Sequence, residues 1–444
     1  MQAPSRKPWL YRLYRVIFPL LLPFLLCRLI WKSRQDRAYR ERLSERLGFL
    51  PFRIVRPVVW IHAVSLGEVV AASPFIDAWL SASPHDTVLV TTTTPTGSYQ
   101  VKKRFGDRVK HCYFPYDTTG CIRRFFVRCQ PKVLIVLETE LWPVLFETCY
   151  QRQIPIFNLN GRISDKSWPR YTRILPVMRY ILPFIQQVFA QSAENGERFL
   201  QLGLDPKQLT VLGNLKFDVS TPQYEPSLET STRKVLNDNT EKKRFIWVAA
   251  STHPGEETQL LDILPKLSAH IPQLLLVLIP RHPHRFETVA TLLADRGFHF
   301  AQRSKGEACH SDTAVYLADT IGEVPLFYRL ADIAFVGGSL VPIGGHSLLE
   351  PTVAGLPVFS GPHNENGKEI ADSLVKAGVL TVVPTADALY EAILTFFNSP
   401  ELRIDSQEKG RRFIETHRGS SEKARQHIIT YLNEPVKFQK NNTE

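Results

Sequence analysis

A carboxylate lies directly behind the first apolar run in the body of the chain. Glu68 follows the run Val58–His62 through a short turn that contains Gly67. A carboxylate in such a turn can take a proton from a substrate hydroxyl, and a glycine lets the backbone approach a ligand closely. The dipole of a helix also favours an acidic residue in the first helical turn. Glu68 is therefore a candidate general base, and stabilisation of the following helix is the alternative role.

Two further carboxylates, Glu138 and Glu140, follow the apolar run Val133–Leu137. This pair could bind a metal ion, polarise an acceptor or cap the next helix. The sequence contains no D-x-D motif, which disfavours a metal-assisted nucleotide-sugar site. The hydroxyl-rich segment 91–97 suits anions or sugar hydroxyls, and it suits capping of the following helix equally well.

A longer polar segment, 160–171, clusters Arg162, Lys166 and Arg170 with two aromatic residues. Guanidinium and ammonium groups of this kind suit the phosphates of an amphiphilic substrate. The alternative is a solvated loop, but a long loop between regular elements favours a functional role.

The second half of the chain has polar or glycine-rich segments after several apolar runs, at 251–257, 280–283, 319–324, 337–339 and 344–351. Such loops bind phosphate through backbone amides. We expect Arg281 to neutralise a leaving phosphate and Glu350 to bind ribose hydroxyls. His253, His282 and His346 also lie in these segments, but their wide spacing without a nearby cysteine disfavours zinc.

These segments need elements that hold them at one edge of a sheet. Short, almost continuously apolar runs alternate with stretches of helical spacing, which predicts an α/β fold with parallel sheets covered on both faces. The expected strands are 58–62, 87–92, 133–137, 154–159 and 188–191, then 245–250, 274–279, 314–317, 333–336, 357–359 and 380–383. We therefore predict two Rossmann-like domains that bind ligands in a cleft at the carboxyl ends of their strands.

The predicted domains are 58–220 and 221–444, with a final helix that could return to the first domain. The polar segment Asn214–Asn239 is expected to be a linker without a strand. The six cysteines include no CxxC pair, which favours reduced thiols in a cytoplasmic body.

The charge of the chain is concentrated at its N-terminus. The whole sequence of 444 residues has a net charge of +11, and residues 1–57 hold 13 of its 54 Lys and Arg but only 3 of its 43 Asp and Glu. A nucleic-acid-binding protein would spread this charge over its body, so we expect no nucleic-acid partner. With 44% apolar and 22% charged residues, the chain is neither disordered nor a polytopic membrane protein.

Residues 1–57 are predicted to anchor the protein to a membrane. The run Val16–Cys27 is apolar, contains Pro19 and Pro23, and has basic residues on both sides. It is shorter than the roughly 20 residues of a spanning helix, which favours an uncleaved segment that lies on or dips into an anionic leaflet from the cytoplasmic side. A buried core helix is the alternative. The charged segment Asp36–Leu47 is expected to form a surface helix.

The chain carries, in this order, the motifs SLGEV, ETELWP, NGRISDKSW, AQSAEN, GNLKFD, ASTHPGEE, PRHPHR and GGSLVPIGGHSLLEP. Together with the basic anchor, they resemble the transferases of 3-deoxy-D-manno-octulosonic acid (Kdo), bacterial glycosyltransferases with the two-Rossmann GT-B fold. The resemblance covers nearly the whole chain. It implies inverting, metal-independent transfer of Kdo from CMP-Kdo to lipid IVA, the lipid A precursor, during lipopolysaccharide assembly. It also implies work without a cofactor at the cytoplasmic face of the inner membrane.

The resemblance also assigns roles to residues. Glu68 is then the general base, Glu138 or Glu140 lies in the acceptor site, and Lys216 meets a Kdo carboxylate. With Gly67 and Arg162 these residues form the expected acceptor-binding set. The expected CMP-binding residues are Pro280, Arg281, Ile321, Gly322, Glu323, Ser347, Leu348, Leu349 and Glu350. The family usually has Asn where this chain has Ser347, whose shorter side chain reaches less far.

Two other functions remain as alternatives. One is a UDP-sugar enzyme of the same architecture, such as a 2-epimerase or a lipid-linked GlcNAc transferase, which the preferred nucleotide would distinguish. The other is a membrane-tethered binder of anionic lipid, against which the nucleotide-binding segments of the second half count.

Overall fold

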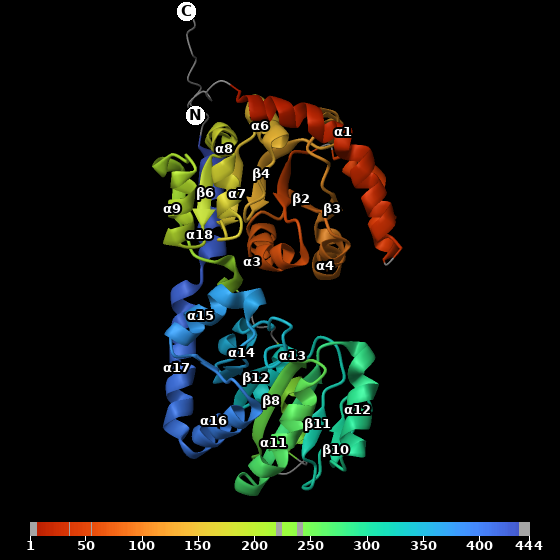
Figure 1. Cartoon of the computed structure of the whole chain (residues 1–444), viewed down its shortest axis with the longest axis vertical. Coiled ribbons are helices and arrows are strands. Elements are labelled where there is room, and N and C mark those ends of the chain that lie inside the picture. The colour runs from red at the N-terminus through yellow and green to blue at the C-terminus, as the bar shows by residue number, and fades with distance from the viewer. Residues whose placement is uncertain (1–6, 35, 55, 219–223, 238–242, 435–444) are drawn as a thin grey trace, which may run out of the picture. The chain divides into compact units, whose positions relative to one another are not determined.

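The computed structural model describes residues 7–434 except 35, 55, 219–223 and 238–242. The chain forms two compact units: Met1–Asp218 with His417–Glu444, and Val219–Thr416 (Figure 1). The expected boundary between residues 220 and 221 lies outside the described residues. We refer to the two as unit 1 and unit 2.

Unit 1 is built on a seven-stranded sheet in the order β3-β2-β1-β4-β5-β6-β7, and every pair of neighbouring strands is parallel. The chain starts at the central strand, builds outward through β2 and β3, and then returns to the other side through β4. This reversal between β1 and β4 is the topological switch point, where open α/β sheets bind ligands. The strands are β1 (Val58–His62), β2 (Thr87–Thr92), β3 (Lys110–Tyr113), β4 (Pro131–Leu137), β5 (Ile156–Gly161), β6 (Gln187–Ala190) and β7 (Leu209–Val211).

The predicted α/β fold is confirmed, and the strands that sequence reasoning missed lie at sheet edges. β3 and β7 are the outer strands of unit 1, and β10 (Phe300–Gln302) is an outer strand of unit 2. An edge strand is short and is not covered on both sides, so it lacks the continuous apolar run that marks an internal strand.

Helices cover both faces of the unit 1 sheet. Val58 and Trp60 of β1 point into one apolar cluster with α5, α6 and α8, whereas Val59 and Ile61 point into the opposite cluster with α3, α4 and α18. Successive side chains of a strand point to opposite faces, so β1 is apolar throughout because both faces are buried. The helices of unit 1 are α1 (Trp9–Lys32), α2 (Leu43–Arg46), α3 (Leu66–Ala82), α4 (Pro95–Phe105), α5 (Thr119–Arg128), α6 (Pro143–Gln151), α7 (Trp168–Arg173), α8 (Leu175–Ile181), α9 (Ala193–Gln201) and α18 (Ser420–Asn433).

The N-terminal helix α1 is longer than its apolar run and begins on the protein surface of unit 1. Figure 1 shows it, in red, along the outside of this unit. Tyr11 is fully buried and donates a hydrogen bond of 2.5 Å to Glu147, which Lys7 also contacts at 2.5 Å. The start of α1 is therefore held by the protein, whereas the rest of the helix is not buried, so α1 is not the buried core helix of the alternative. Its 24 residues include both prolines, and by length and composition alone it could cross a membrane.

The expected surface helix over Asp36–Leu47 is wrong. The segment forms a 3-10 turn at Arg37–Arg40 and the single helical turn α2, separated by Arg42 with a positive φ of 56°. Glu45 is buried, accepts hydrogen bonds from Arg42 and from the Tyr113 backbone amide, and so ties this segment to β3. The helical spacing of its charges therefore reflects internal contacts as much as a solvent-exposed face.

Unit 2 repeats the plan of unit 1. Its parallel seven-stranded sheet has the order β10-β11-β9-β8-β12-β13-β14, with the switch point between β8 and β12. The remaining strands are β8 (Phe245–Thr252), β9 (Leu274–Pro280), β11 (Val315–Leu317), β12 (Ile333–Val336), β13 (Val358–Ser360) and β14 (Leu380–Val382). The helices are α10 (Pro226–Leu236), α11 (Glu256–His270), α12 (Phe286–Asp295), α13 (Val324–Leu330), α14 (Leu349–Val353), α15 (Lys368–Lys376), α16 (Ala386–Asn398) and α17 (Pro400–His417).

The segment expected to be a linker is largely structured. α10 occupies 226–236, and its Leu236 is fully buried in a cluster with Ile246 of β8 and Leu326 of α13. Its polar composition belongs to the outer face of a helix that packs on unit 2.

The last described helix, α18, is capped by a residue 200 positions earlier in the chain. The two carboxylate oxygens of Asp218 accept hydrogen bonds of 2.6 Å from the backbone amides of Gly419 and Ser421. Ala424 and Ile428 of α18 are fully buried in a cluster with residues of α3. Asp218 therefore closes unit 1 by satisfying the free amides at the start of its final helix.

We expect Asp218→Ala to destabilise unit 1 by about 1 kcal/mol, because it leaves two amides of α18 without their acceptor. For a unit of this size, the thermal unfolding midpoint would fall by about 2–4 °C. Glu422→Ala is the matched control, since Glu422 lies in the first turn of α18 and, among the described residues, bonds only to Arg425 and Gln426 of the same helix. Equal midpoints for Asp218→Ala and Glu422→Ala would show that the cap does not stabilise this helix.

Candidate functional site

Glu68 lies at the switch point of unit 1, in the first turn of α3 behind β1. Its side chain is 8% exposed, and it accepts a 2.8 Å hydrogen bond from the Val64 amide and a 3.2 Å bond from the Ser65 hydroxyl. The turn between strand and helix therefore holds both carboxylate oxygens. Gly67 is exposed, and a Cβ there would meet only the Ser65 hydroxyl at 3.9 Å, so the space beside Glu68 is open.

The threonine-rich segment supports this turn from β2. The Thr93 amide and hydroxyl donate to the Val64 carbonyl at 3.0 and 3.2 Å, and Thr94 caps α4 through the Gly97 amide at 3.1 Å. Of the two roles left open for segment 91–97, the structure thus shows helix capping, together with support of the Glu68 turn.

Glu138 and Glu140 follow β4, the neighbour of β1 at the switch point. Glu138 has a positive φ of 50°, a strained conformation for a residue with a side chain. The Asn158 amide holds the Glu138 carbonyl at 2.6 Å. Neither carboxylate caps α6, because the buried Asp117 accepts the hydrogen bonds of its Val144 and Leu145 amides. Helix capping is therefore excluded as the role of the pair.

Neighbouring carboxylates in this cluster affect the pKa values of Glu68 and Glu140. Burial raises the pKa of Glu68 to about 8, and the negative charge of Glu140 adds to the rise. Burial likewise raises the pKa of Glu140 to about 7, with a contribution from Glu138. A buried carboxyl with a raised pKa is a stronger base once it ionises. Carboxyl groups whose pKa values are shifted in this way mark functional sites more often than structural ones.

The basic segment after β5 is held more firmly than a solvated loop. The Arg162 carbonyl accepts a hydrogen bond from Thr139, beside Glu138 and Glu140. Asn195 of α9 accepts from the Ile163 amide at 2.7 Å. The Arg162 side chain is half-buried, while Lys166 and Arg170 are exposed.

Lys216 is linked to the same edge of the sheet through Asn160. Asn160 is buried, has a positive φ of 61°, and accepts a 3.0 Å hydrogen bond from the Leu215 amide. The short 3-10 helix Leu215–Asp218 thereby sets the half-buried Lys216 beyond the end of β5. Sequence reasoning did not single out Asn160 or Asn195, although each stands within a motif that it used.

In unit 2, a buried carboxylate occupies the glycine loop after β12. Glu256 is fully buried and accepts hydrogen bonds from four backbone amides, those of His253, Gly338, Ser339 and Leu340, at 2.7–3.0 Å. The expectation that loop 337–339 binds phosphate through its amides is therefore wrong. The protein supplies its own carboxylate there, and sequence reasoning did not give Glu256 this role although it stands within the segment 251–257.

The residues expected to bind CMP begin at the end of β9. Pro280 ends this strand, and the Arg281 amide donates to the Thr252 carbonyl at 3.0 Å, which places Arg281 beside the end of β8. Burial raises the pKa of Glu350, while the Ser347 hydroxyl and the Arg281 charge oppose the rise. Arg281, Ser347 and Glu350 thus lie within electrostatic reach of one another. Leu348 and Leu349 are buried between them at the start of α14.

The segment 321–323 forms a tip beside α13. Ile321 is 70% exposed, and Gly322 has a positive φ of 94° with open space at its Cβ position. Glu323 pairs with Arg303 at 2.7 Å, so its carboxylate is already engaged. Burial raises the pKa of Tyr224, and the charges of Glu323 and Glu350 add to the rise. Tyr224, which sequence reasoning missed, therefore lies near both segments.

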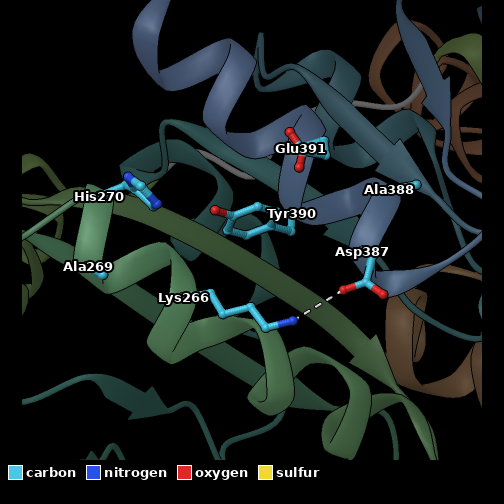
Figure 2. A pocket seen from close by; sticks show the side chains of 7 residues that line it. All are labelled: Lys266, Ala269, His270, Asp387, Ala388, Tyr390 and Glu391. Carbon is cyan, nitrogen blue, oxygen red and sulfur yellow. Dashed lines mark hydrogen bonds and ion pairs between the residues drawn. The ribbon is translucent and has the colours of Figure 1, made fainter.

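A separate pocket of about 650 Å³ lies between α11 and α16, as Figure 2 shows. Lys266 and Asp387 face each other in it at 3.5 Å, but none of the residues predicted to act lines it. Within the described ranges, no group of three or more His, Cys, Asp or Glu is arranged to hold a metal ion.

Comparison with known proteins gives a consistent family. A family model described as 3-deoxy-D-manno-octulosonic-acid transferase (kdotransferase) matches residues 41–219. The 3-deoxy-D-manno-octulosonic acid transferase of Haemophilus influenzae is 40% identical over 426 residues, which cover 95% of this chain and 99% of that protein. The protein of the same name from Bordetella pertussis is 34% identical over 416 residues, 89% of this chain and 94% of that protein.

Among solved structures, UDP-GlcNAc 2-epimerase from Neisseria meningitidis bound to UDP-GlcNAc superposes with a TM-score of 0.58 at 15% identity, over 84% of this chain and 100% of that one. At this identity the likeness shows a shared fold, two Rossmann-like units of the GT-B kind. The functional assignment rests on the sequence relatives. The chain belongs to the 3-deoxy-D-manno-octulosonic acid transferase family and is a glycosyltransferase of lipopolysaccharide biosynthesis.

Proposed function

We propose that the protein transfers Kdo from CMP-Kdo to lipid IVA with inversion, using Glu68 as its general base. The observation that carries the proposal is the buried Glu68 at the switch point of unit 1, with its raised pKa and two fixed oxygens. Membership of the family supports the donor and the lipid acceptor.

In this mechanism, Glu68 takes the proton of an acceptor hydroxyl as that oxygen attacks the anomeric carbon of Kdo. The bond from this carbon to the phosphate oxygen breaks, and its electron pair leaves with CMP. Arg281 stabilises the charge that develops on the phosphate. Inversion in a single displacement needs one base, and Glu68 is the carboxylate best held for this role.

The other predicted residues divide between the two substrates. Gly67, Glu138, Glu140, Arg162 and Lys216 contact the acceptor or the Kdo carboxylate in unit 1. Pro280, Arg281, the tip 321–323 and the segment 347–350 bind CMP in unit 2. The Ser347 hydroxyl also acts on Glu350, and its short side chain reaches less far toward the nucleotide than the family's usual Asn would.

Helix α1 is proposed to attach the protein to the cytoplasmic face of the inner membrane. Its exposed apolar side chains are Trp9, Leu13, Val16, Ile17, Leu20, Leu21, Phe24, Ile30 and Trp31. The surplus of basic residues in 1–57 supports contact with anionic lipids.

The direct test is mass spectrometry of lipid IVA incubated with the full chain and freshly generated CMP-Kdo. We expect products heavier than the acceptor by one or more Kdo units, and we expect CMP, but not UDP, to raise the thermal unfolding midpoint. Protection by UDP alone would instead support the 2-epimerase or GlcNAc-transferase alternative. Lipid binding without release of CMP would support the tethered lipid binder.

Glu68→Gln should lower kcat by about 10²–10⁴, the usual contribution of a general base, and leave the affinity for CMP nearly unchanged. Steady-state kinetics and calorimetry with CMP measure the two quantities separately. Glu194→Gln is the matched control, because Glu194 also lies in the first turn of a helix behind a unit 1 strand but is exposed. Near wild-type turnover by Glu68→Gln would exclude it as the base.

The pH dependence should follow the ionisation of Glu68. Only the ionised carboxylate accepts a proton, so kcat/KM should rise with pH and level off above about 8, the raised pKa of Glu68. Glu140→Gln removes a neighbouring negative charge, which lowers this pKa and moves the rising limb to lower pH. Profiles between pH 6 and 9.5 measure the shift. A limb that stays in place in Glu140→Gln would show that it reports another group.

A further inference from the structure

Two histidines of unit 2 share a hydrogen bond that the proposed mechanism does not use. His253 follows β8 and His346 lies in the loop after β12, on the two sides of the switch point. Their Nε2 atoms are 2.8 Å apart, and their rings are nearly parallel, with centroids 5.0 Å apart. A contact of this length requires one Nε2 to carry a proton and the other to accept it.

Both histidine rings pack against the glycine loop at Gly338. A Cβ on Gly338, whose φ is 70°, would approach the His346 ring at 3.1 Å and the His253 ring at 3.5 Å. Glu256 fixes the backbone of His253 and of Gly338, because its carboxylate accepts hydrogen bonds from both amides. The backbone beneath the His253 ring is therefore fixed, and the two rings fill the space that a side chain at Gly338 would need.

Burial and the charged groups around the pair keep it uncharged. Burial lowers the pKa of both histidines, that of His346 to about 4. Arg281 acts on both in the same direction, His282 adds to the effect on His346, and Arg285 adds to the effect on His253. Glu257 opposes the effect on His253, but it is paired with Arg285 at 2.5 Å. Glu256 is the other carboxylate in contact, and its oxygens are occupied by amides.

Resting on the proposed donor, we propose that the His253–His346 pair takes up a proton when an anionic phosphate binds beside Arg281. Burial and the Arg281 charge together keep the pair uncharged when the site is empty. The negative phosphate offsets the Arg281 charge and favours the protonated pair, and the proton gained by the pair adds a positive charge at the phosphate. His253 and His346 thus contribute to donor affinity and to stabilisation of the leaving CMP, and the protein binds the donor with a charge that it does not carry when empty.

The experiment is calorimetry of CMP binding to the full chain at pH 6.5, in two buffers of different ionisation enthalpy, which yields the number of protons taken up. CMP itself titrates in this range, so the comparison is between the wild type and two single variants, His253→Gln and His346→Gln. We expect each variant to take up fewer protons, by as much as one per CMP, and to bind CMP about tenfold more weakly at pH 6, with the difference shrinking toward pH 8. His270→Gln, in the pocket of Figure 2, is the control and should behave as the wild type.

A measurement on the wild type alone guards against variants that fold poorly. Cytidine 5′-methyl phosphate carries one negative charge that does not titrate between pH 6 and 8, and its cytosine ring is neutral there, so any pH dependence of its affinity in this range comes from the protein. We expect its affinity to weaken as the pH rises over this range. A flat profile, or unchanged proton uptake in both variants, would overturn the role of the pair. Absence of CMP binding to the wild type would overturn the proposed donor as well.

Discussion

Both sheets are entirely parallel and are covered by helices on both faces, and this arrangement constrains everything else in the molecule. Strand residues such as Val58, Val59, Trp60 and Ile61 are fully buried whichever way they point. A polar side chain within a strand needs a partner inside the protein, as His62 and Thr91 have in each other, because a buried polar group without a partner is costly. Polar groups that can meet a ligand therefore lie at the strand ends. The carboxyl ends of parallel strands lie at one edge, so these groups gather there.

The backbone at these ends is adapted to that task. Glu138, Asn160 and Ser251 are three of the non-glycine residues with a positive φ, and each lies at or directly after the carboxyl end of a strand next to or near a switch point. Such conformations persist only where the surroundings fix them. Asn160 illustrates how, because its side chain accepts from the Leu215 amide and so links β5 to the segment that carries Lys216.

The two units use this edge with opposite charge. Unit 1 gathers Glu68, Glu138 and Glu140, where burial, with a smaller contribution from the neighbouring carboxylates, raises the pKa of Glu68 and that of Glu140. In unit 2, Arg281 lies near His253 and His346, whose pKa values are lowered so that they stay neutral beside it. The buried carboxylate of unit 2, Glu256, accepts hydrogen bonds from loop amides. Both features fit the proposed transfer from a phosphate-activated sugar, because a carboxylate cluster suits removal of a proton and a cationic site suits an anion.

The sequence by itself determined the α/β class, the internal strands and the residues at their ends, because a strand that is buried on both faces needs a continuous apolar run, which is local in the chain. The ordered motifs at these strand ends indicated the family. The sequence also marked Glu68, whose position behind the first run is a short-range feature. The tertiary structure alone decided which polar groups are free for a ligand. Asp117, and not Glu138 or Glu140, caps α6. Glu256 accepts from the amides of residues 338–340, and Asp218 caps α18 through Gly419, which lies 201 residues later in the chain. These partners meet only through the packing of distant segments, and no spacing along the chain records such contacts.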